Sequence, residues 1–109
     1  MFAKDPYESI IDFIDAVIDS DQITSWLSAL ESLTQNTRTI HLAETKIKME
    51  NDGAPKEHIE IIQFMQNEKI LRAMNSVIRD VHASGMRTKK FISKTNNTNY
   101  KTLISLIAR

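Results

Sequence analysis

The sequence predicts an all-α protein of one domain, whose centre is a long antiparallel hairpin of two helices. Apolar residues recur at steps of three and four along most of the 109-residue chain, which is the period of helices that bury one face. The two glycines and two prolines all fall where that pattern is interrupted, so they mark helix boundaries. A chain of this length is expected to form one domain, here residues 1–109.

The first helix is predicted at about residues 5–19. Pro6 follows Asp5 and is followed two residues later by Glu8, a pattern typical of an N-cap, a proline at the first helical position and a capping-box acid. Its apolar face comprises Ile10, Ile11, Phe13, Ile14, Val17 and Ile18. Its acidic face is a candidate protein-binding surface, formed by Glu8, Asp12, Asp15 and Asp19.

The second helix is predicted at about residues 21–50, with Ser20 or Asp21 as its N-cap. It carries a heptad repeat, which is typical of a helix that packs along its length against a partner helix. The seam residues are Ile23, Trp26, Leu30, Leu33, Thr37, Ile40, Glu44 and Ile47. Such a seam serves for pairing within one chain or between two chains, and the second case predicts a homodimer.

The third helix is predicted at about residues 56–84. It follows the clearest break in the chain, where Gly53 suits a left-handed helix end and Pro55 can begin the next helix. The short connection folds the two long helices back antiparallel. The first helix and a broken C-terminal helix then cover this hairpin. Trp26 is predicted to be a core residue at the open end, level with Ile78 and Val81.

Charge is divided unevenly along the chain. Residues 1–54 hold four basic and ten acidic residues, for a net charge of −6, whereas residues 55–109 hold ten and four, for a net charge of +6. One interpretation is attraction between the two halves inside one fold. The alternatives are self-association and a basic end that meets an anionic partner.

The C-terminal segment, residues 85–109, gives the best functional clue. It predicts a basic helix over 88–94, a turn at 96–98 and a second helix over 99–108 capped by Thr98, which is the outline of a helix-turn-helix appendage. The turn lacks the usual glycine and apolar residue, so a broken fourth helix of a bundle is the alternative. The candidate nucleic-acid contacts are Arg87, Lys89, Lys90, Lys94, Asn99, Tyr100, Lys101 and Arg109.

Catalytic, metal and cofactor sites are not expected. The chain has no cysteine, and its three histidines lie apart in the predicted hairpin, whereas a metal site needs three or four converging ligands. There is also no glycine-rich phosphate loop and no glycine-flanked serine. The carboxylates of the first helix are expected to be a solvated face rather than an acid–base pair.

These patterns favour a small, non-enzymatic regulatory protein of the cytoplasm, since no signal-peptide pattern or membrane-spanning apolar run is present. Its expected partner is nucleic acid, met through the basic C-terminal segment. The alternative is a helical adaptor or inhibitor that binds only protein.

Overall fold

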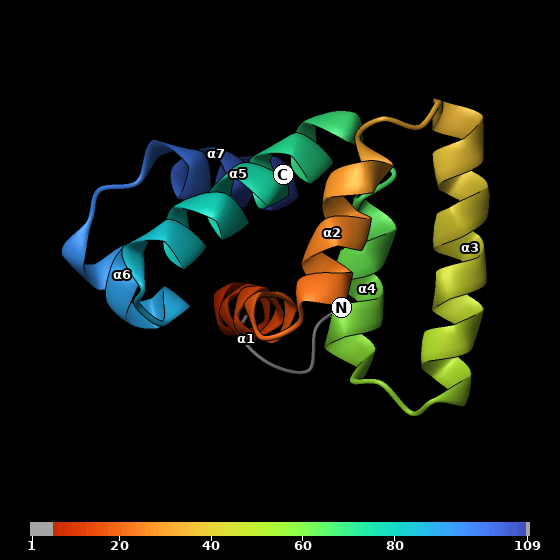
Figure 1. Ribbon diagram of the computed structural model, residues 1–109, viewed down its shortest axis with the longest axis horizontal. Helices are drawn as coiled ribbons and strands as arrows, with labels where there is room; N and C mark the ends of the chain where they lie inside the picture. The colour runs from red at the N-terminus through yellow and green to blue at the C-terminus, as the bar shows by residue number, and fades with distance from the viewer. Residues whose placement is uncertain (1–5, 109) are drawn as a thin grey trace.

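Seven α-helices and no strand make up residues 6–108, the part of the chain that the computed structural model describes (Figure 1). The helices are α1 (Pro6–Ile18), α2 (Asp21–Leu30), α3 (Gln35–Asn51), α4 (Lys56–Phe64), α5 (Glu68–Ser84), α6 (Thr88–Lys94) and α7 (Thr98–Ile107). The predicted all-α class is confirmed, and so are the N-terminal helix and the broken C-terminal helix.

The prediction of one continuous helix over 21–50 is wrong. The chain leaves the helix after Leu30 and enters α3 at Gln35, and α2 and α3 run in opposite directions (Figure 1). The side chain of Thr34 caps α3, because its hydroxyl oxygen accepts a hydrogen bond from the backbone N–H of Thr37 at 3.2 Å. The heptad pattern continues across the turn at residues 31–34, and for that reason the sequence pattern did not indicate the turn.

The prediction of one continuous helix over 56–84 is also wrong, because the chain turns at residues 65–67. The Asn67 side chain accepts hydrogen bonds from the backbone N–H groups of Lys69 and Ile70, at 2.9 and 3.3 Å, and so caps α5. The two breaks lie together, since Gln35 Nε2 donates to the carbonyl oxygen of Gln66 at 3.1 Å. The predicted hairpin is therefore retained only as α3 and α4, which pack on each other across the Gly53 turn.

The end of α2 is closed by two buried polar side chains from other helices. Arg38 of α3 is 2 % exposed, and its Nε donates to the carbonyl oxygen of Leu30 at 3.2 Å while its Nη2 donates to that of Leu33 at 3.0 Å. Asn75 of α5 donates to the carbonyl oxygen of Leu27 at 3.0 Å. Carbonyl groups in the last turn of a helix lack partners within the helix, so these contacts stabilise the turn into α3.

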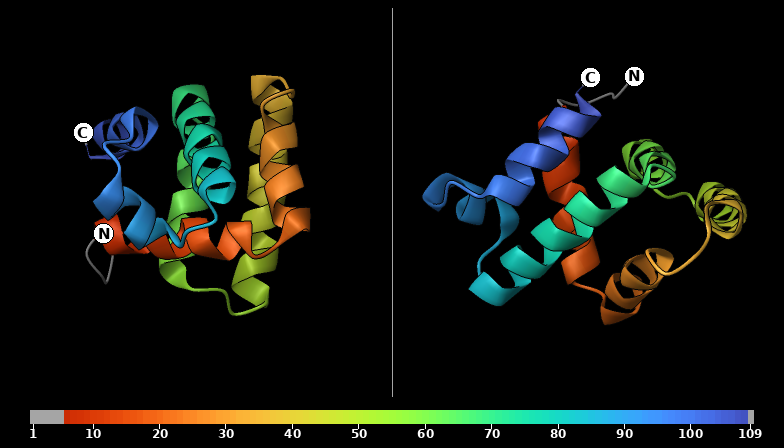
Figure 2. Two further views of the ribbon diagram at one scale, coloured as in Figure 1. Left: turned by 60° about the vertical axis from the view of Figure 1, so that its left-hand side comes forward. Right: turned by 90° about the horizontal axis from the view of Figure 1, so that it is seen from above.

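The core is organised around α1, which packs against α2, α4, α5 and α6 (Figure 2). Its apolar face is almost fully buried. The core residues contributed by the other helices include Leu27, Leu30, Leu42, Ile61, Met65, Leu71, Met74, Ile78, Phe91 and Leu103. Both α6 and α7 thus contribute a side chain to the same core, and the division of the chain into a domain and an appendage at 85–109 stays a prediction.

The predicted heptad seam is not buried along α3. The face of α3 that packs inward carries Arg38 and Leu42, whereas Ile40 and Ile47 are 60 and 58 % exposed. Trp26 is half-buried and packs against the core, and it lines a cleft with Met49 and Ile62 because the turn after α2 folds α3 back along α2. Among the helices of residues 6–108, none is both long and apolar enough to cross a membrane.

Candidate nucleic-acid interface

The basic C-terminal segment begins where Gly85 ends α5. Gly85 takes a left-handed conformation with a φ of 71°, which a glycine adopts without strain. After α6, the side chain of Asn97 accepts a hydrogen bond from the backbone N–H of Tyr100 at 2.8 Å and caps α7. The cap predicted at Thr98 is therefore one residue too late, and the helix–turn–helix order of the segment is present.

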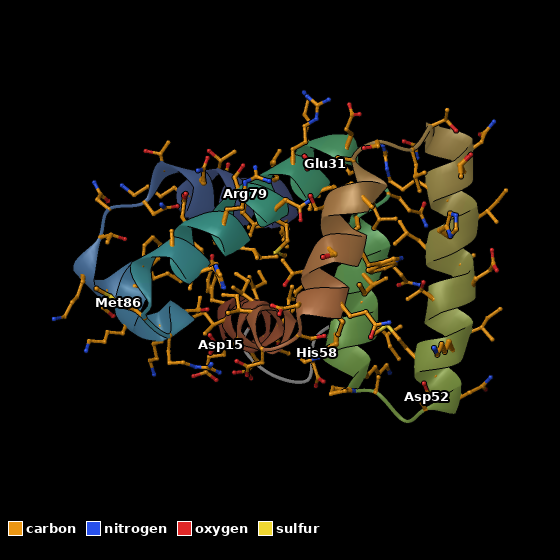
Figure 3. The ribbon with its side chains drawn as sticks, in the orientation of Figure 1. Asp15, Glu31, Asp52, His58, Arg79 and Met86 are labelled. Atoms are coloured by element: carbon orange, nitrogen blue, oxygen red, sulfur yellow. The ribbon has the colours of Figure 1, made fainter. Side chains whose placement is uncertain are left out.

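The start of α6 is held by the carboxylate of Asp15 from α1 (Figure 3). Oδ1 of Asp15 accepts hydrogen bonds from the backbone N–H of Thr88 at 3.0 Å and from the Thr88 hydroxyl at 2.6 Å. The residue at the N-cap of α6, Arg87, makes no side-chain cap bond. Asp15 therefore supplies the cap of α6 from another helix.

Arg87 is bound to α1 as well. Its Nη1 and Nη2 donate to the two carboxylate oxygens of Asp19 at 2.9 and 3.3 Å, and its Nε lies 3.8 Å from Asp15 Oδ1. The hydrogen bond with Arg87 lowers the pKa of Asp19 below its ordinary value, and the same pair raises the pKa of Arg87. The two halves of opposite charge thus meet inside one fold at this point.

These contacts divide the two predicted sets of site residues. Of the acidic set, Asp15 and Asp19 are engaged with α6 and Arg87, while Glu8 and Asp12 are exposed on α1. Of the basic set, Lys89, Lys90, Lys94 and Lys101 are exposed. Arg109 lies outside the described residues.

Asn99 and Tyr100 are half-buried rather than presented to solvent. The side-chain amide of Asn99 donates to Asp80 Oδ2 at 2.9 Å, and that of Asn97 donates to the same oxygen at 2.9 Å. Tyr100 lies in a shallow depression beside Tyr7 and Ile104. Their contacts with α5 and α1 thus give both residues a role in holding α7.

Two further cations, Lys69 and Arg72, lie on α5 beside α7. Because α7 packs against α5, one shallow groove of about 370 Å³ lies between them. We call it the α5–α7 groove. It is lined by Lys69, Arg72, Ala73, Ser76, Asn99, Thr102 and Leu106. Arg72 also lies 3.6 Å from Glu68.

Sequence reasoning missed Lys69 and Arg72 because it described the third helix by its apolar stripe alone. The sequence does contain a pattern that indicates a basic face, since Lys69, Arg72 and Arg79 recur at helical spacing on the polar side of this helix. What the sequence did not give was the position of α7 beside that face.

Among residues 6–108, no three histidine or carboxylate side chains lie close enough to hold a metal ion. The α5–α7 groove is lined by the cations Lys69 and Arg72 and by the hydroxyl group of Thr102, which suit an anion held in place by charge and hydrogen bonds. Comparison with known protein families, curated proteins and solved structures finds no match for this chain.

Proposed function

We propose that this protein is a small, non-enzymatic regulatory protein of the cytoplasm that binds nucleic acid through the surface formed by α5, α6 and α7. The observation that supports the proposal most is the packing of α7 on α5, which sets Thr102 of α7 beside Lys69 and Arg72 of α5 around one groove. Lysine, arginine, serine, threonine and asparagine are the side chains that contact phosphate oxygens in protein–nucleic acid complexes.

The charge of the surrounding segment favours the same function. Residues 81–108 contain five lysines and arginines and no aspartate or glutamate. Arg87 is paired with Asp19, whereas the four lysines of α6 and α7 are exposed, and an exposed lysine can contribute its charge to phosphate binding.

The geometry favours binding to the phosphate backbone over reading of bases. The exposed face of α7 carries Thr98, Lys101, Thr102 and Ser105, with one cation among them. The amide of Asn99, the side chain best suited to pair with adenine, is already donated to Asp80. We therefore expect binding with weak sequence preference and a strong dependence on salt.

Fluorescence anisotropy of a labelled 20-nucleotide probe, in duplex and single-stranded form, tests this proposal at several salt concentrations. The variant Lys69→Glu with Arg72→Glu and the variant Lys89→Glu with Lys90→Glu should each weaken binding. Each should also reduce the slope of log K against log salt by about 2, since about one unit is lost for each phosphate contact.

A matched control is Lys48→Glu with Lys56→Glu, which changes the net charge by the same amount on α3 and α4. It should bind as the wild type does once the helical content of all variants has been shown equal by circular dichroism. If the control loses as much affinity for the probe as both test variants do, the loss comes from the change in net charge and not from these surfaces. If the wild type does not bind the probe at low salt, the proposed function is excluded.

Protein binding is the second candidate, and one observation favours it. Ile40 and Ile47 lie seven residues apart on the outer face of α3 and are more than half exposed. An antiparallel second copy of α3 would place Ile40 of one chain opposite Ile47 of the other. This arrangement would make a homodimer through the heptad seam that the sequence contains.

A further inference from the structure

A second hollow of the surface lies between α1, α2, α3 and α4, away from the α5–α7 groove. It is a cleft of about 420 Å³, within the range of small-molecule sites. Its apolar lining comes from Phe13, Ala16, Val17, Ile23, Trp26, Met49 and Ile62. The broken second helix creates this cleft, because the turn at residues 31–34 brings Trp26 of α2 to face Met49 of α3.

Aromatic side chains form part of the walls. The ring of His58 meets the ring of Phe13 edge to face, with 5.7 Å between centroids and 82° between planes. Figure 3 shows His58 near the end of α4 that lies beside α1 and α2. Trp26 is half-buried and Ile23 is 42 % exposed, so the cleft keeps apolar surface in contact with water.

The polar part of the lining has one sign of charge. Among the described residues that line the cleft, the ionisable side chains are Lys48 and His58, and the neutral polar ones are Gln22 and Thr45. Of these two ionisable residues, Lys48 is the exposed one. An apolar ligand body would bury the exposed parts of Trp26 and Ile23, while an anionic head group would meet Lys48.

We propose that this cleft binds a small amphipathic carboxylate, with its hydrocarbon part against Trp26, Phe13 and Ile62 and its carboxylate beside Lys48. The cleft has a volume of about 420 Å³ and is partly open to solvent. That space suits a chain of medium length or a single aromatic ring system. The site is independent of the proposed nucleic-acid surface, which other helices form.

The test uses octanoate as the probe and Trp26 as the reporter, because Trp26 is the one tryptophan in the chain. Octanoate should produce a saturable change in tryptophan emission and a matching heat in titration calorimetry. Octan-1-ol, with the same chain and no charge, should bind more weakly, and octylamine, with the opposite charge, should bind more weakly still.

Two variants of the full chain locate the ligand. Lys48→Glu should weaken octanoate binding by about fivefold, as expected for loss and reversal of one partly exposed charge contact. Ala16→Phe places a ring in the cleft from an exposed position of α1 and should abolish the saturable signal. Lys56→Glu makes the same charge change outside the cleft and should leave binding unchanged.

Three results would overturn the proposal: no saturable response in the wild type, equal affinity for octanoate and octan-1-ol, or equal affinity of the Lys48→Glu and Lys56→Glu variants. Circular dichroism establishes that each variant is folded. If Ala16→Phe does not fold, the comparison of the two lysine variants decides. Because Lys48 and Lys56 lie outside the α5–α7 groove, failure of this proposal leaves the nucleic-acid test unaffected.

Discussion

Nε of Arg38 lies 3.2 Å from the carbonyl oxygen of Leu30, and this hydrogen bond joins the start of α3 to the end of α2. The guanidinium also donates to the Leu33 carbonyl at 3.0 Å and to Gln35 Oε1 at 3.1 Å. A cation at a helix C-terminus interacts favourably with the helix dipole. The last turn of α2 has no basic residue of its own, so Arg38 supplies this charge from the next helix.

Replacement of Arg38 should therefore be costly. Arg38→Met removes donors from two carbonyl groups near the end of α2 and should lower the free energy of unfolding by about 2–3 kcal/mol. Urea denaturation followed by circular dichroism measures this change. Arg72→Met is the control, since Arg38 and Arg72 lie 3.7 and 3.6 Å from the carboxylate of Glu68 but Arg72 is exposed. It should change stability by less than about 0.5 kcal/mol, and equal losses in both variants would contradict the role given to Arg38.

The cap that Asp15 provides for α6 gives a second prediction. Asp15→Ala and Thr88→Val should each lower the free energy of unfolding by about 1 kcal/mol, the usual cost of losing a helix cap. The double variant should lose less than the sum, because the two residues share one interaction. Thermal denaturation of the wild type, the two single variants and the double variant measures this coupling. Strict additivity would show that the hydrogen bond from the Thr88 hydroxyl to Asp15 contributes no stability.

The pairing of Asp19 with Arg87 predicts a dependence on pH. The pKa of Asp19 is lower in the folded protein than its ordinary value of 3.8, so the unfolded chain takes up a proton first as the pH falls. The contribution of this pair is therefore present above pH 3.8 and is lost as the pH falls through the folded pKa.

NMR titration of the Asp19 carboxyl group measures that shift. In Arg87→Met the pKa of Asp19 should rise toward 3.8, because the hydrogen bond that lowers it is gone. Lys89→Met removes a neighbouring exposed cation and should leave the Asp19 titration close to that of the wild type. The same titration in both variants would show that Arg87 is not the cause.

The exposed isoleucines of α3 predict self-association. Ile40→Glu with Ile47→Glu should shift a dimer toward monomer, because each charge would be buried against an apolar partner side chain. Sedimentation equilibrium over a range of concentrations measures the change. Gln63→Glu with Gln66→Glu adds two carboxylates at other exposed positions and should leave the dimer intact. A wild type that stays monomeric throughout would exclude this interface.

Capping residues and glycines predicted the helix ends that they form. The start of α1 and the Gly53 and Gly85 turns follow from capping residues and glycines, and the structure places them within one or two residues of the prediction. The turns before Thr34 and Asn67 were missed because each capping residue sits inside an apolar repeat that continues past it. A repeat describes which face can be buried, and it does not require that the helix be continuous.

The burial of Arg38 could not be predicted from the sequence. Arginine is almost never fully buried without partners, and here two of the partners are backbone carbonyl groups of a turn that the sequence did not predict. The candidate binding surface was predicted only in part for a similar reason. Lys89, Lys90, Lys94 and Lys101 were identified from charge alone, whereas Lys69 and Arg72 joined the surface through the position of α7.

The cap that joins Asp15 to Thr88 also has a consequence for synthesis on the ribosome. The two residues are 73 positions apart, so at about 5–20 residues per second α1 would wait about 4–15 s before its partner in α6 has been made. During that interval α2, α4 and α5 can already pack on α1, so the part of α1 that stays uncovered is the side that receives α6. Products that end before residue 88 should therefore leave that side of α1 exposed, and they should aggregate more readily than the full chain.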